Sequence, residues 1–263
     1  MKPLDQLKPS DVAPLVGVIF DLDDTLLDHG RLTEPAYGAL FRLKEVGFRL
    51  IGATGRPYGW IELLSRQWPV DAMIAENGSA AVLRNSDGSL SPRLPAAAER
   101  RAELLSLAAR LVSQFPSAKI TSDNGARVVD VTIDVGESCR VPADQIQAMC
   151  RIARDEGVAT VVSSVHLHLT YDFPDKAAGA VRIISEAFGE DETAARRRYA
   201  FIGDSGNDAA AFAAFKMTFG VANVSASADT LTLLPRYVAP FPMGRGFAEI
   251  AAALVSQKRA VNV

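Results

Sequence analysis

The feature that most constrains the fold is an apolar run that ends abruptly in an aspartate. Residues 16–20 are all apolar or glycine, and Asp21 follows at once. Such a run is typical of a strand buried on both faces of a parallel sheet. Residues 34–46 then carry apolar side chains at helical spacing. The same alternation continues with a strand at 48–53, a helix at 57–67 and a strand at 71–75. It predicts an α/β fold, a Rossmann-like parallel sheet with helices on its faces.

A different pattern follows residue 78 and lasts for about ninety residues. It predicts helix–strand–strand twice over, with helices at 96–114 and 143–156 and strands at 117–121, 126–135, 158–163 and 165–171. Strand–helix alternation returns at Lys176. We therefore expect a core of residues 1–80 and 173–263, with an α+β cap inserted at 81–172.

Composition limits the partners. The 263 residues carry a net charge of -3 without a block of like charge, which suggests neither nucleic acid nor an anionic membrane as partner. No apolar stretch approaches the roughly 20 residues that span a bilayer, and the N-terminus does not resemble a signal peptide. Cys139 and Cys150 are expected as reduced thiols rather than a disulfide. We expect a cytoplasmic protein, monomeric or homodimeric, that acts on a small molecule.

Reactive side chains follow three of the predicted strands. In open α/β sheets, ligands lie beyond the carboxyl ends of the strands. The three segments are Asp21-Leu22-Asp23-Asp24-Thr25, Thr54-Gly55-Arg56 and Gly203-Asp204-Ser205-Gly206-Asn207-Asp208. Lys176 opens the helix where the core resumes. We therefore expect one site at this edge of the sheet.

The carboxylates of that site need a positive partner, because like charges cannot gather uncompensated. A divalent cation with oxygen ligands would resolve the repulsion, and Mg²⁺ suits such ligands. Lys176, Thr54 and the backbone N–H groups near Gly55 can hold phosphoryl oxygens. Together these groups are what phosphoryl transfer requires. The carboxylates concerned are Asp21, Asp23, Asp204 and Asp208.

These four motifs, in this order, resemble those of the haloacid dehalogenase (HAD) superfamily of phosphatases. The resemblance implies that Asp21 is the nucleophile and a metal ligand. It implies that Asp23 is the general acid and base, with a backbone carbonyl on the metal. It further implies that Thr54 and Lys176 hold the phosphate and that Asp204 binds Mg²⁺ directly. Asp208 would be a metal ligand or a supporting residue, and Asn207 would assist phosphate or metal binding.

The place of the insert, opened by Glu76-Asn77-Gly78-Ser79, resembles that of type IIB caps. Relatives of this class include sucrose-phosphate and mannosyl-3-phosphoglycerate phosphatases, and also phosphomannomutases. The resemblance implies a Mg²⁺-dependent phosphomonoesterase that acts on a sugar phosphate or a similar metabolite through an aspartyl-phosphate. The alternatives are a phosphomutase and a non-catalytic binding protein. Many relatives have glycine where this chain has Asp24, for which a turn-capping role is favoured over tuning of the site's charge.

Substrate choice is expected to depend on the cap. Strand residues alternate between the two faces of a sheet. If Leu167 and Leu169 face the cap helices, the side chains between them lie on the opposite face of the sheet, which covers the site. This predicts specificity residues at Asp130, Thr132, His166 and His168, with Arg56 either touching substrate or bracing the loop near Glu76. Surface histidines and a transition-metal pair are the alternatives for His166 and His168.

Overall fold

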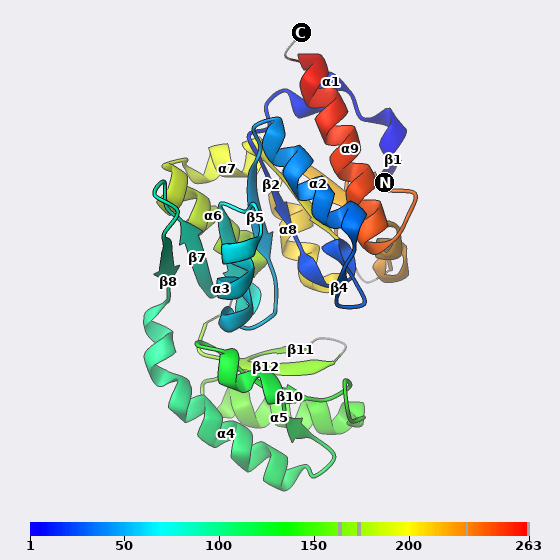
Figure 1. Cartoon of the computed structure of the whole chain (residues 1–263). Helices are drawn as coiled ribbons and strands as arrows, with labels where there is room; N and C mark the ends of the chain where they lie inside the picture. Colours follow the sequence, from blue (N-terminus) through cyan, green and yellow to red (C-terminus); the bar gives the residue numbers. More distant parts are fainter. Residues whose placement is uncertain (163–164, 173–174, 230, 262–263) are drawn as a thin grey trace.

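The computed structural model describes residues 1–162, 165–172, 175–229 and 231–261. It consists of a large α/β part and a smaller part that hangs below it (Figure 1). The chain enters the smaller part once and leaves it once, so the large part is discontinuous in sequence. This arrangement confirms the predicted fold class.

The large part is built on a sheet that has nine strands among the described residues, in the order β1-β15-β14-β13-β2-β5-β6-β7-β8. All neighbours are parallel except the pairs β6–β7 and β7–β8. The strands are β1 (Lys2–Pro3), β2 (Gly17–Phe20), β5 (Arg49–Ala53), β6 (Ala72–Ala75), β7 (Ala80–Arg84), β8 (Leu90–Arg93), β13 (Tyr199–Gly203), β14 (Met217–Gly220) and β15 (Tyr237–Val238).

Helices cover both faces of this sheet and create two separate hydrophobic cores. Val18 and Phe20 of β2 pack into the core on one face, and Ile19 between them packs into the core on the other. This is why the run that ends in Asp21 is apolar at every position. The first face carries α1 (Pro9–Val12), α2 (Glu34–Glu45), α3 (Tyr58–Gln67) and α9 (Met243–Val261), and the second carries α6 (Lys176–Phe188), α7 (Glu192–Arg198) and α8 (Ala209–Ala214).

The smaller part has its own sheet, in the order β11-β12-β10-β9, with antiparallel neighbours. Leu167 and Leu169, together with Val131 and Ile133, pack in a third core beneath two helices. The alternation expected for these strands is therefore confirmed. The elements are α4 (Arg101–Gln114), β9 (Lys119–Ile120), β10 (Val131–Asp134), α5 (Ala143–Asp155), β11 (Ala159–Val162) and β12 (His166–Thr170).

The hairpin of β7 and β8 continues the large sheet, although the sequence assigned it to the insert. Its strands extend that sheet through antiparallel pairing with β6. We therefore propose that the smaller part, which we call the cap, comprises residues 94–172 rather than 81–172. Residue 173, where the core was predicted to resume, lies outside the described residues. Helix α7 was not predicted; its last turn holds the basic run Arg196–Arg198.

A small hairpin of β3 (Leu27–Asp28) and β4 (Arg31–Leu32) follows the aspartate-rich segment after β2. Its tip, His29 and Gly30, lies beside the site described below. Cys139 and Cys150 are free thiols. Across the described residues, no helix combines the length and apolar character that crossing a bilayer requires.

Candidate active site

Three predicted segments meet at one edge of the large sheet. Strand β2 lies between β13 and β5 and is parallel to both, so the residues that follow these strands emerge side by side. Asp21 follows β2, Thr54 follows β5 and Asp204 follows β13. The backbone N–H of Asp21 donates to the Ile202 carbonyl and so extends the β2–β13 pairing to the aspartate itself.

A buried acidic cluster occupies this edge. Asp21, Asp204 and Asp208 each offer a carboxylate oxygen, and these oxygens all lie within 4.8 Å of one another. The ammonium of Lys176, only 1% exposed, lies 2.5 Å from Asp21 Oδ1 and 2.8 Å from Asp208 Oδ1. Asp175, the N-cap of α6, accepts the Ala178 N–H and fixes the helix start that carries this lysine. One buried cation thus faces three buried carboxylates.

The electrostatics of the cluster show that one ammonium does not satisfy it. Burial raises the pKa of Asp21 well above its ordinary value, although Lys176 opposes the rise. Burial, reinforced by Asp208, raises the pKa of Asp204 to about 6. Burial alone would lower the pKa of Lys176, but the neighbouring Asp208 and Asp21 carboxylates raise it above the ordinary value. A further positive charge would stabilise the ionised carboxylates.

Asp208 is fully engaged by the protein. One oxygen accepts from Lys176, and the other accepts the backbone N–H groups of Asp204 and Ser205 at 2.9 and 3.2 Å. A Cβ on Gly203 would lie 2.4 Å from Asp208 Oδ2, which explains why glycine ends β13. Of the two roles considered for Asp208, this geometry favours support of the loop.

Two residues to which the sequence motifs assigned no role hold Asp204. Thr25 Oγ1 donates to one carboxylate oxygen at 3.1 Å, and Asn223 Nδ2 donates to the other at 2.8 Å. Asn223 Nδ2 also donates to the carbonyl of Asp24 at 3.0 Å. Asp24 has φ +55°, a left-handed conformation that suits glycine and is tolerated by aspartate. This left-handed backbone favours the turn-forming role of Asp24 over tuning of the site's charge.

Asp23 turns away from the acidic cluster. Its two oxygens accept from Arg56 Nε and Nη2, both at 2.8 Å, in a bidentate pair. The Arg56 guanidinium also lies over the Trp60 ring, 4.6 Å from its centroid. The Thr54 hydroxyl accepts the Arg56 N–H at 3.1 Å. The sequence predicts that Arg56 either contacts substrate or braces the loop near Glu76. In the structure its guanidinium instead pairs with Asp23, the predicted general acid.

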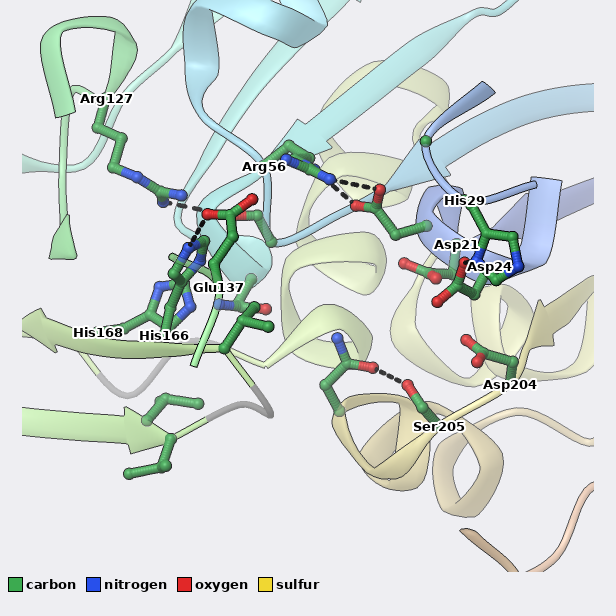
Figure 2. Close-up of a pocket in the computed structure, with 18 residues that line it drawn as sticks. Asp21, Asp24, His29, Arg56, Arg127, Glu137, His166, His168, Asp204 and Ser205 are labelled. Atoms are coloured by element: carbon green, nitrogen blue, oxygen red, sulfur yellow. Dashed lines mark hydrogen bonds and ion pairs between the residues drawn. The ribbon is translucent and has the colours of Figure 1, made fainter. Parts of the chain in front are cut away.

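A cavity of about 390 Å³ opens between this edge and the cap (Figure 2). That volume is within the range of small-molecule sites. Among the described residues, its core side is lined by Asp21, Asp23, Asp24, His29, Gly30, Gly55, Arg56, Asn77, Asp204, Ser205 and Asn207. Its cap side is lined by Arg127, Glu137, Val161, Val162, Val165, His166 and His168.

The two predicted roof histidines lie on the cap side, opposite Asp21 and Asp204 in Figure 2. His168 Nδ1 lies 2.7 Å from Asp130 Oδ2, and His166 Nε2 lies 2.9 Å from Glu137 Oε2. Each ring is therefore paired with a carboxylate. This geometry does not favour a transition-metal pair.

Other predicted residues stand behind the cavity surface. Thr54, Lys176 and Asp208 are buried beneath the core side, and Asp130 lies beneath His168. Thr132 is not among the described residues that line the cavity; its hydroxyl is hydrogen-bonded to Thr121. Of the four cap residues predicted to set specificity, Thr132 is the one whose side chain neither lines the cavity nor is hydrogen-bonded to a residue that lines it.

Comparisons with known proteins agree with this geometry. Residues 18–109 match the model of the haloacid dehalogenase-like hydrolase family. A search of curated proteins finds no match. Among solved structures, the chain is similar to a Thermoplasma acidophilum protein, with TM-score 0.72, 17% identity, and coverage of 91% of this chain and 98% of that one.

Two further structures are similar. A haloacid dehalogenase-like hydrolase from Bacteroides thetaiotaomicron has TM-score 0.66 and 16% identity, over 90% of this chain and 98% of that one. The sucrose-phosphatase of Synechocystis, in complex with sucrose and phosphate, has TM-score 0.64 and 17% identity, over 91% of this chain and 97% of that one. At these identities the likeness concerns the fold. The matched family model adds that residues 18–109, which include Asp21 and Thr54, are similar to haloacid dehalogenase-like hydrolases.

Proposed function

We propose that the protein is a Mg²⁺-dependent phosphomonoesterase that acts on a sugar phosphate or a similar small phosphate ester. The observation that carries the proposal is the buried cluster of Asp21, Asp204 and Asp208 around Lys176, at the carboxyl end of the central strand. A cluster of this composition suits a dianionic phosphate held with a divalent cation. The cap, which we assign to type IIB, closes a cavity that suits one small ester.

In the proposed reaction, an oxygen of Asp21 attacks phosphorus while the bond from phosphorus to the leaving oxygen breaks. Asp23 gives its proton to that leaving oxygen. Water then attacks the aspartyl-phosphate, Asp23 takes a proton from the water, and the Asp21 carboxylate is restored. Lys176, Thr54, Asn207 and the backbone near Gly55 hold the phosphoryl oxygens.

The donor set suits magnesium. Asp21 and Asp204 supply carboxylate oxygens beside the cavity, the Asp23 carbonyl would add a neutral oxygen, and Asp208 supports the loop that carries Asp204. A bound Mg²⁺ would neutralise charge on the phosphoryl oxygens and would favour the ionised form of Asp21. The protein would then supply the nucleophile, the proton for the leaving oxygen and the groups that orient the ester.

Phosphate release tests the proposal. The purified protein is assayed on a panel of phosphorylated sugars and on p-nitrophenyl phosphate, with Mg²⁺ and with chelator. We expect turnover that needs the cation and disappears in Asp21→Asn, which keeps the shape of the side chain but removes its nucleophilic charge. Activity that survives chelation or this substitution would refute the mechanism. Transfer from a bisphosphate without net phosphate release would instead identify a phosphomutase.

Cytoplasmic location and a monomeric or homodimeric state stay predictions from the sequence.

A further inference from the structure

Glu76 is a buried carboxylate of the core that does not line the cavity. It follows β6 directly and is fully buried. Its φ is +50°, a backbone conformation that residues other than glycine rarely adopt. Asn77 after it also has a positive φ, and Gly78 follows in the same region. Strained backbone of this kind persists only where the surrounding contacts fix it, and such strain clusters at functional sites.

The carboxylate of Glu76 accepts three hydrogen bonds from the cap and one from a core helix. Its Oε1 accepts the Val128 N–H at 2.9 Å, and its Oε2 accepts the Val129 and Asp130 N–H groups at 2.8 and 2.9 Å. A fourth N–H, that of Tyr58, donates to Oε1 at 3.1 Å. Three consecutive backbone donors of the cap thus converge on one side chain of the core.

The third of these donors belongs to the residue that holds His168. Asp130 is buried, accepts from Arg127 Nη1 at 2.9 and 3.1 Å, and pairs with His168 Nδ1. Arg127 in turn donates to the Gly55 carbonyl at 3.2 Å, a second contact between cap and core. Glu76 and Gly55 together therefore fix where the Asp130–His168 pair stands above the site.

The pairing with Asp130 determines which ring nitrogen of His168 a ligand meets. A carboxylate on Nδ1 keeps the proton of the neutral ring on that nitrogen and leaves Nε2 as the acceptor. The His168 ring lines the cavity on the side opposite Asp21 (Figure 2). An acceptor at this place suits a hydroxyl of the leaving group.

We propose that Glu76 is a positioning residue that, through the Val128–Asp130 backbone and the Asp130 carboxylate, orients His168 and thereby sets selectivity for a hydroxylated leaving group. Glu76 does not touch the substrate in this scheme. The selectivity part rests on the proposed phosphatase function, whereas the positioning of His168 does not.

The first test reads the histidine directly. The chain has three histidines, so ring ¹⁵N spectra can be assigned with His29→Asn and His166→Asn. In wild type at slightly alkaline pH, we expect His168 as the Nδ1–H tautomer. Glu76→Gln, which places an amide N–H₂ against backbone donors, should shift His168 toward the Nε2–H tautomer or an average of the two. A His168 spectrum identical to wild type in a folded Glu76→Gln protein overturns the proposal. If Glu76→Gln does not fold, Asp130→Asn breaks the same chain one step later and is read in the same way.

The second test uses kcat/KM for glucose 6-phosphate relative to p-nitrophenyl phosphate, whose leaving group carries no free hydroxyl. We expect Glu76→Gln and His168→Ala to change this ratio by about tenfold, the effect of roughly one hydrogen bond, and the double variant to change it no further. Equal losses on both esters, or independent effects in the double variant, contradict the proposal. Absence of turnover by the wild type would instead refute the phosphatase function and leave the spectroscopic result to stand alone.

Glu190→Gln is the matched control. Glu190 is also a mostly buried carboxylate, with 9% side-chain exposure, and it pairs with Arg49 and Arg198 beside the start of β5, at the edge of the sheet away from the site. We expect it to lower stability without changing the His168 tautomer or the selectivity ratio. A change in either equal to that of Glu76→Gln would show that the effect is a general loss of structure.

Discussion

Replacing Lys176 with methionine should lower the unfolding free energy of the metal-free protein by about 3–5 kcal/mol. The ammonium lies 2.5 and 2.8 Å from Asp21 and Asp208, and all three side chains are at most 5% exposed. At an effective dielectric constant of about 20, each pair attracts with roughly 6 kcal/mol. Desolvation of the ions offsets much of that attraction, but methionine leaves two buried carboxylates without their cation, and that loss is not offset.

Lys44→Met provides the comparison, because Lys44 makes a pair of similar geometry nearer the surface. Its ammonium lies 2.8 and 2.9 Å from the two oxygens of Asp71, but the side chains are 34% and 25% exposed. Water screens such a pair, so its loss should cost about 0–1 kcal/mol. The two variants remove the same charge and differ mainly in burial.

The assay is urea denaturation followed by the fluorescence of Trp60 and Trp68, first in chelator and then with Mg²⁺. We expect Lys176→Met to be much less stable than Lys44→Met in chelator. We also expect Mg²⁺ to stabilise Lys176→Met more than wild type, because a cation bound only by the folded state replaces the missing charge. A cost for Lys176→Met no larger than that for Lys44→Met would refute the reasoning.

Three further predictions concern the same site. In the metal-free protein, the Asp204 pKa of about 6, against an ordinary 3.8, means that the folded state holds a proton that the unfolded state releases. The unfolding free energy should therefore fall by about 3 kcal/mol as pH rises from about 4 to 7. Asp204→Asn should flatten this dependence of stability on pH, and equal slopes in the two proteins would contradict the prediction. Arg56→Ala should lower kcat/KM for p-nitrophenyl phosphate by no more than about tenfold, because the pair with Asp23 is partly exposed; complete loss of turnover would show that Arg56 has a larger role. Gly203→Ala should cost about 1–3 kcal/mol in urea denaturation, because its Cβ would meet Asp208 Oδ2 at 2.4 Å; a neutral result would show that the loop adapts.

The core could be predicted from the sequence because its signals are local. The apolar runs expected as strands at 16–20 and 48–53 each form a strand within a residue of those bounds. Parallel pairing then brings the residues after adjacent strands together without any further information. The sequence places residues 81–93 in the insert, whereas β7 and β8 pair into the large sheet, because a change of pattern along the chain does not indicate which sheet a strand joins.

The partners of the site residues could not be predicted, because they are set by packing between distant segments. Asn223 belongs to no recognised motif, yet it donates to Asp204, which lies 19 positions earlier in the chain. Arg127 and Glu137 lie in cap loops with ordinary polar composition and reach the cavity only because the cap folds over the core. Thr132 alternates correctly along β10, but its hydroxyl is taken by Thr121. Periodicity assigns a face of a sheet and does not assign a hydrogen-bond partner.

Asp21 and Asp23 are two residues apart, and their different partners suit the different roles proposed for them. Asp21 is held by an ammonium that is 1% exposed, so its carboxylate stays fixed in the cluster, as a nucleophile that must meet phosphorus in line requires. Asp23 is held by Arg56 in a pair whose side chains are 35% and 28% exposed. Because water screens this partly exposed pair, it holds its carboxylate less firmly than the buried pair of Lys176 and Asp21 does. A carboxyl that must give up and regain a proton in each turnover can therefore exchange the guanidinium for a leaving oxygen or a water at little cost. The buried ammonium of Lys176 thus suits Asp21 as a fixed nucleophile, and the partly exposed guanidinium of Arg56 suits Asp23 as an acid that can move.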